Sequence, residues 1–112
     1  MTPHDFPESD WKTFRQVREL ALERFCQRVL DKIEQIIRDP SLSQHQRYLK
    51  VFRFLRDRDD ELAQAFNDPR RSRMILQLVM VHKYGLLTPD ELGRFTARTR
   101  ETIEWLAGGS GR

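Results

Sequence analysis

The sequence is poor in the residues that build small catalytic and metal sites. Its single cysteine, Cys26, cannot form a disulfide within the chain or supply a thiolate cluster for zinc. The three histidines, His4, His45 and His82, lie far apart and outside spacings such as His-Glu-x-x-His. Neither a glycine-rich phosphate loop nor a Gly-x-Ser-x-Gly elbow occurs. The sequence therefore predicts a protein that is not an enzyme and that uses no metal and no cofactor.

Long apolar runs are also missing. The most apolar segment, Met74 to Val81, is far shorter than the roughly 20 residues that span a bilayer, and the N-terminal residues do not have the pattern of a signal peptide. Together with the lone cysteine, this predicts a cytoplasmic protein with no membrane span. A length of 112 residues fits one domain, predicted over residues 1–107, and the glycine-rich residues 108–112 are predicted to be a disordered tail.

No segment alternates with the period of a strand, and caps and breakers predict an all-α fold instead. Ser9 is placed to cap a first helix that runs to Asp39, where Pro40 stops it. Ser43 and Gln46 form a capping box for a second helix over Gln44 to Phe66. The short break between the two predicts a long antiparallel hairpin.

The rest of the sequence predicts a central helix and two short ones. Asp68 and Pro69 are a start signal for a third helix, which is apolar nearly all round and ends at Gly85. Thr88 and Pro89 start a fourth helix that reaches about Phe95, and Thr96 can cap a last one. We therefore expect a small helical bundle of three main helices, the hairpin plus the central helix, with two short C-terminal helices.

Positive charge collects in one place. The chain is arginine-rich, with a net charge of +3, and residues 69–85 contain four cations and no acid. Three of these cations stand at the predicted start of the third helix: Arg70, Arg71 and Arg73. Cations there oppose the helix dipole, and a bound anion would offset that cost, so the cluster is a candidate site for an anion, a nucleic-acid backbone or an acidic partner. Alternatively, the arginines pair internally with Asp57, Asp60 or Asp68.

Two charges interrupt the predicted apolar stripes. On a helical wheel Asp59 projects between Tyr48 and Phe52, and Arg18 projects between Phe25 and Trp11. Since an isolated buried charge is costly, we expect Arg18 and Asp59 to pair under the hairpin, directly or through water. The alternative is that Asp59 is a lone buried carboxylate lining a ligand pocket.

The function favoured by these observations is a protein-interaction or regulatory helical module, with a protein partner of unknown identity. The first helix is apolar over more than half its circumference, and Leu30 and Ile37 extend its stripe toward one edge. This predicts self-association as a homodimer, unless the C-terminal helix of the same chain covers that edge. His82, on the central helix, is the one candidate for a pH-sensitive group. Nucleic-acid binding through the phosphate backbone and the three arginines is the less favoured alternative.

Overall fold

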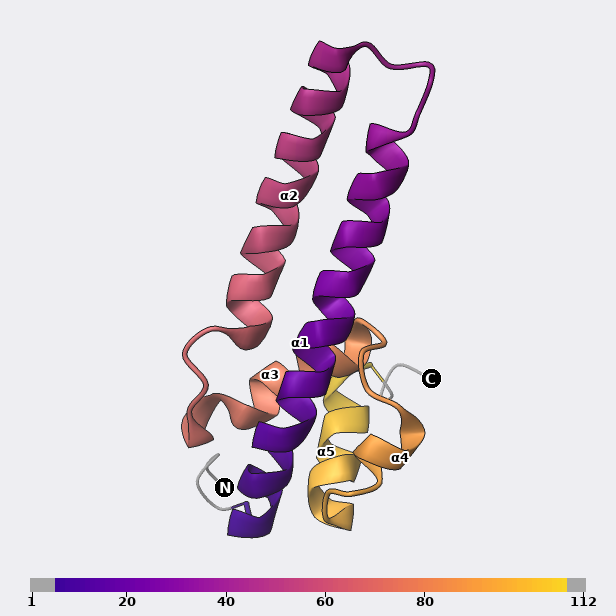
Figure 1. The fold of residues 1–112 in the computed structure, drawn as a ribbon. Coiled ribbons are helices and arrows are strands. Elements are labelled where there is room, and N and C mark those ends of the chain that lie inside the picture. The colour runs from indigo at the N-terminus through magenta and orange to yellow at the C-terminus, as the bar shows by residue number, and fades with distance from the viewer. Residues whose placement is uncertain (1–5, 109–112) are drawn as a thin grey trace.

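The computed structural model describes residues 6–108 and confirms the all-α fold class (Figure 1). Its helices are α1 (Glu8–Ile37), α2 (Gln44–Phe66), α3 (Met74–Lys83), α4 (Pro89–Leu92) and α5 (Ala97–Leu106). No strand occurs within residues 6–108. None of the helices in this range is long and apolar enough to cross a membrane. The predicted tail falls almost wholly on residues 109–112, which lie outside the described range.

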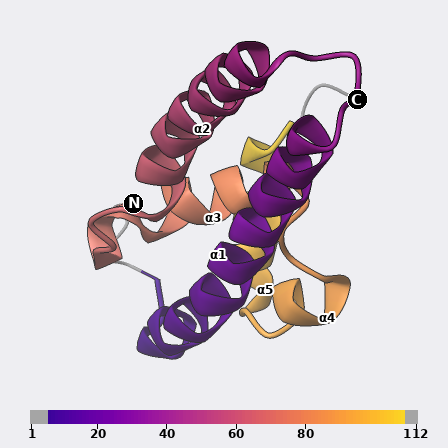
Figure 2. The ribbon, with the colours of Figure 1, turned by 45° about the horizontal axis from the view of Figure 1, so that its top comes forward.

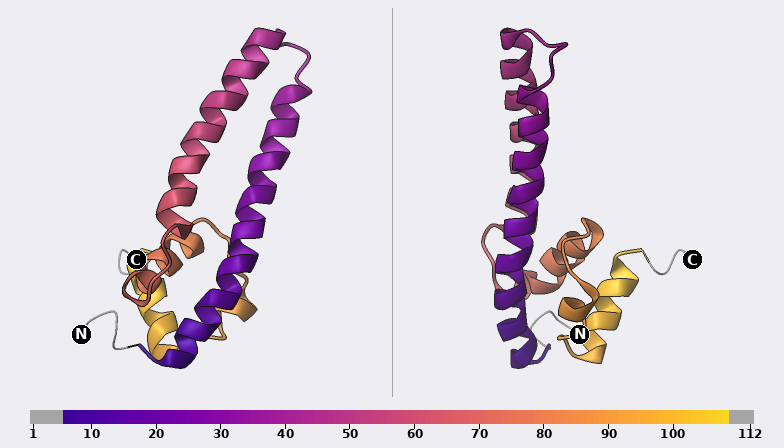
Figure 3. Two further views of the ribbon diagram at one scale, coloured as in Figure 1. Left: turned by 60° about the vertical axis from the view of Figure 1, so that its left-hand side comes forward. Right: turned by 45° about the vertical axis from the view of Figure 1, so that its right-hand side comes forward.

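The two long helices form the predicted antiparallel hairpin. Helix α1 has 30 residues, so it is about 45 Å long, and α2 runs back beside it after a short turn (Figures 1 and 3). Helix α2 has the predicted bounds and capping box, in which the Gln46 amide donates to Ser43 Oγ at 3.1 Å and the Ser43 amide donates to Gln46 Oε1 at 2.7 Å. The start predicted for α1 was wrong by two residues, because its N-cap is Pro7 and Ser9 lies inside the helix.

Helices α3, α4 and α5 pack together at the open end of the hairpin (Figures 1 and 2). They enclose a core built from α1 as far as Val29, the last turn of α2 and α3 to α5, with Phe14, Val17, Phe66, Leu78 and Ile103 among its buried side chains. We call this part the base. The remainder of the hairpin, residues 30–61, projects away from it, and we call it the arm (Figure 3).

Helix α3 is the apolar centre that the sequence predicts, but it begins later. Residues Arg71–Arg73 form a turn of 3-10 helix, and the α-helix starts at Met74 rather than near Asp68. Asp68 has a left-handed backbone, with φ of 53°, and its carboxylate binds arginines instead of capping α3. The predicted end is confirmed, because Gly85 has a φ of 69° and the Leu86 amide donates to the Val81 carbonyl, as in a Schellman motif.

Candidate functional site

Most apolar side chains of α2 remain outside the core. Only Ala65 and Phe66, in its last turn, are buried. Tyr48 is 68% exposed, Phe52 53% and Leu55 47%. A helix of a globular protein normally covers an apolar stripe of at least about 100°. Along most of the arm α1 is the neighbour of α2, and Tyr84 reaches α2 beside Phe54 and Arg58. Tyr48, Phe52 and Leu55 of its stripe stay exposed within the described residues.

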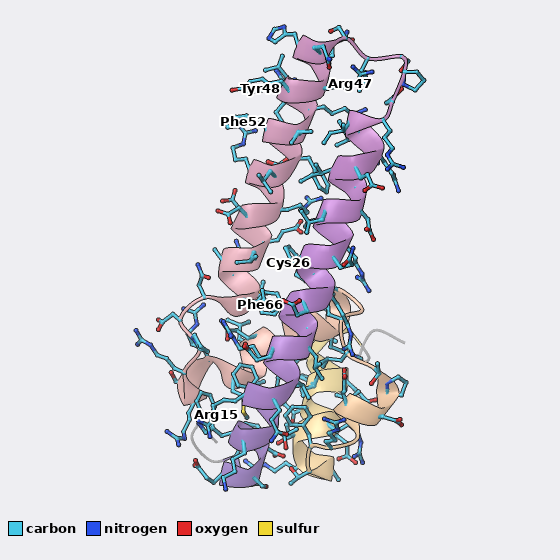
Figure 4. All side chains as sticks on the ribbon, viewed as in Figure 1. Arg15, Cys26, Arg47, Tyr48, Phe52 and Phe66 are labelled. Atoms are coloured by element: carbon cyan, nitrogen blue, oxygen red, sulfur yellow. The ribbon has the colours of Figure 1, made fainter. Side chains whose placement is uncertain are left out.

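Two residues of α1 extend this surface. Leu30 is 60% exposed and Ile37 is 55% exposed. We call the five side chains the arm face: Leu30, Ile37, Tyr48, Phe52 and Leu55. Two shallow grooves cross it, one bounded by Cys26, Leu30 and Leu62 and the other by Ile37, Tyr48 and Phe52, and both include Leu55. In Figure 4, Tyr48 and Phe52 lie on the projecting part of α2, far from the base.

The base leaves the arm face open. Ala21, which the base buries completely, precedes Leu30 by nine residues, or about 180° around α1. Helices α3 to α5 lie on one side of the hairpin (Figure 3, right), so the arm face looks to the other side. The alternative in which the C-terminal helix covers Leu30 and Ile37 is wrong, because α5 packs on α3 at the base.

Charge is divided along α2. Residues 44–56 contain four cations and no acid, whereas residues 57–66 contain four acids and one arginine. This order opposes the helix dipole, which favours acids near the N-terminus and cations near the C-terminus. The charges nearest the arm face are Arg56, whose guanidinium lies 5.7 Å from the centre of the Phe52 ring, and Asp59, which lines one groove.

The predicted pair of Arg18 and Asp59 was wrong. Asp59 is exposed, while Arg18 donates to the Phe66 carbonyl at 2.6 Å and to Glu19 at 3.0 Å. Phe66 is seven residues, about 10 Å, beyond Asp59 on α2. Its carbonyl belongs to the last turn of α2, where carbonyls lack partners within the helix, so it is the better acceptor for a cation. Exposure of Asp59 also excludes the alternative of a lone buried carboxylate.

The three arginines before α3 have acidic partners within the chain. Arg70 donates to Asp68 at 2.9 Å, and Arg73 lies 3.7 Å from the same carboxylate. Arg71 binds both oxygens of Glu8, at 2.6 and 3.2 Å, and its hydrogen bond lowers the pKa of Glu8. Of the three predicted partners, Asp57, Asp60 and Asp68, Asp68 is the one that binds arginines of this cluster. Within the described residues, Asp68 and Glu8 are the acids that these three arginines bind.

An ion pair that the sequence analysis missed joins α1 to α4. Arg24 binds both oxygens of Glu91, at 2.6 and 2.8 Å, and also donates to the Leu86 carbonyl. Glu91 is 4% exposed, and the hydrogen bonds from Arg24 lower its pKa from 4.5 to about 2. Glu91 also completes the predicted capping box by accepting from the Thr88 amide. The box was visible in the sequence, but its second partner 67 residues away was not.

A second missed contact joins α1 to α5. Asp10, 1% exposed, accepts from the Thr96 amide at 2.9 Å and from the hydroxyls of Thr96 and Thr99. Thr96 is the N-cap residue of α5, as predicted, but its side chain makes no capping hydrogen bond. Asp10 therefore holds the start of α5 against the start of α1.

Two side chains with chemically reactive groups are His82 and Cys26. His82 is half-buried on α3, and Cys26 is a free thiol at the edge of a groove. Within residues 6–108 no three His, Cys, Asp or Glu side chains are grouped so as to hold a metal ion. Comparison of the chain with family models, curated proteins and solved structures found no match.

Proposed function

We propose that this chain is a non-enzymatic, cytoplasmic protein-interaction module that binds its protein partner through the arm face. The observation that carries the proposal is the exposure of five large apolar side chains on one side of a projecting hairpin. A contiguous apolar patch of about 300–600 Å² is the largest that a typical monomer exposes, and such a patch often marks an interaction surface.

The polar interior of the base supports the same function. Asp10 and Glu91, the two acids that are buried within residues 6–108, are each engaged in joining helices. Neither faces a groove of the arm. The internal pairing of Arg70, Arg71 and Arg73 likewise favours protein docking over binding to a phosphate backbone.

Site-specific photo-crosslinking in the native cell tests the proposal. A photoreactive amino acid replaces Phe52, and in a matched variant it replaces Gln64, which is exposed on α2 about 120° away around the helix. We expect a discrete crosslinked protein adduct from position 52 and none from position 64. An absence of adducts at position 52, or equal adducts at both positions, would contradict docking through the arm face.

A further inference from the structure

We propose that the arm face binds a second copy of this chain, whose α2 lies antiparallel on the first α2 to form a four-helix bundle from two hairpins. This inference rests on the proposed function, because it names the partner of the same surface.

The charge order of α2 fits an antiparallel copy of itself. A two-fold axis level with Leu55 brings the cationic half of one α2 level with the acidic half of the other. Of these charges Arg56 and Asp59 adjoin the arm face, whereas Lys50 and Arg53 line a groove away from it. Within a single chain the same order opposes the dipole of α2. An antiparallel neighbour supplies charges of the opposite sign and a helix dipole of the opposite direction, so it offsets this unfavourable order.

The apolar surface is self-complementary about the same axis. The two grooves of the arm face meet at Leu55, so a rotation about that level places each groove over the other. Tyr48 of one copy then lies level with Leu62 of its partner, and Phe52 lies over the groove beside Cys26. The base does not obstruct this approach, because it is on the opposite side of the hairpin (Figure 3, right).

The area is sufficient for a specific dimer. The five side chains of the arm face are each about half exposed, which corresponds to roughly 500 Å² per copy and roughly 1,000 Å² for two copies. Polar residues at the edges of the two grooves add to this total. Specific interfaces bury at least about 1,000 Å², so two arms are large enough to hold each other.

Sedimentation velocity on the purified full chain is the first test. We expect twice the chain mass at micromolar concentration. Phe52→Glu should weaken dimerisation by at least about thirtyfold, because it places a charge in the centre of the apolar contact, while helix content by circular dichroism stays unchanged. Gln64→Glu adds the same charge outside the face and should remain dimeric. A wild-type monomer at high micromolar concentration, or a dimer that Phe52→Glu leaves intact, overturns the inference.

Crosslinking tests the antiparallel register. In a Cys26→Ser background, Leu55→Cys lies next to its own symmetry mate, whereas the two copies of Tyr48→Cys lie about 20 Å apart along the bundle. A short bis-maleimide should therefore link Leu55→Cys into dimers and leave Tyr48→Cys unlinked. The reverse result overturns the antiparallel arrangement.

The two proposals fail separately. If the chain is a monomer in solution but position 52 still crosslinks to a different protein in cells, the dimer is overturned and the arm face remains a docking surface. A monomer with no adduct at position 52 overturns both.

Discussion

Replacing Glu91 by Gln should destabilise the fold by about 2–3 kcal/mol at pH 7. A carboxyl whose pKa falls from 4.5 to about 2 on folding contributes about 3 kcal/mol at neutral pH, and the partly exposed Arg24 reduces this by solvent screening. Gln keeps an oxygen for the Thr88 amide, so the capping box of α4 is preserved. The substitution therefore removes the pairing with Arg24 rather than the local helix start.

The effect should depend on pH in a defined direction. Because the folded pKa of Glu91 lies below its ordinary value, the stabilisation is complete above about pH 4.5 and is lost as the pH falls toward about 2. Other acids, including Glu8 and Asp39, also have lowered pKa values and share in acid destabilisation of the wild type. The difference in unfolding free energy between wild type and Glu91→Gln, measured at each pH, gives the part of the acid destabilisation that is due to Glu91.

Urea unfolding followed by circular dichroism, at several values between pH 2 and pH 7, measures this difference. Glu34→Gln is the matched control, because Glu34 pairs with Arg38 at 3.6 Å on an exposed surface, and it should change stability by less than about 0.5 kcal/mol. A loss below about 1 kcal/mol for Glu91→Gln at pH 7, or a loss that is the same at pH 2.5, would refute the assigned role of the ion pair.

Three further changes test other contacts. Asp10→Ala should cost about 2–4 kcal/mol in urea unfolding, because it leaves the buried donors of Thr96 and Thr99 without an acceptor, and a cost below about 1 kcal/mol would contradict this. Arg18→Met should cost about 1–2 kcal/mol through the lost hydrogen bond at the end of α2, and a double-mutant cycle with Asp59→Leu should show no coupling. When the three arginines before α3 are replaced with Ala, the affinity for duplex DNA and its dependence on salt should equal those of the wild type. If the wild type binds DNA in a salt-dependent way and the triple variant does not, the arginines form an anion site.

Local chemistry determined much of the fold. The capping boxes at Ser43 and Thr88 each connect residues three positions apart, and the glycine after α3 takes a backbone that other residues disfavour. Signals of this range can be read from the sequence alone, and the bounds of α2 and the architecture of the bundle followed from them. The predicted start of α3 was wrong because the Asp68 carboxylate could either cap the helix or bind Arg70. In the folded chain it binds Arg70, and the sequence alone did not distinguish the two.

The candidate site depends on how neighbouring helices are placed relative to one another, which a helical wheel does not show. A wheel gives the rotation of a side chain about its own helix, and it correctly showed that α1 has more apolar surface than one neighbour covers. It gives neither the axial offset between two helices nor the place where a neighbour ends. For that reason the wheel predicted Asp59 as the partner of Arg18, which instead binds the Phe66 carbonyl. It also gave no sign that Arg24 pairs with Glu91. The packing of the base on one side of the hairpin decided which apolar side chains were buried and which stayed exposed, the five of the arm face among them. Burial is set by contacts between residues distant in the sequence, and the sequence alone does not give these contacts.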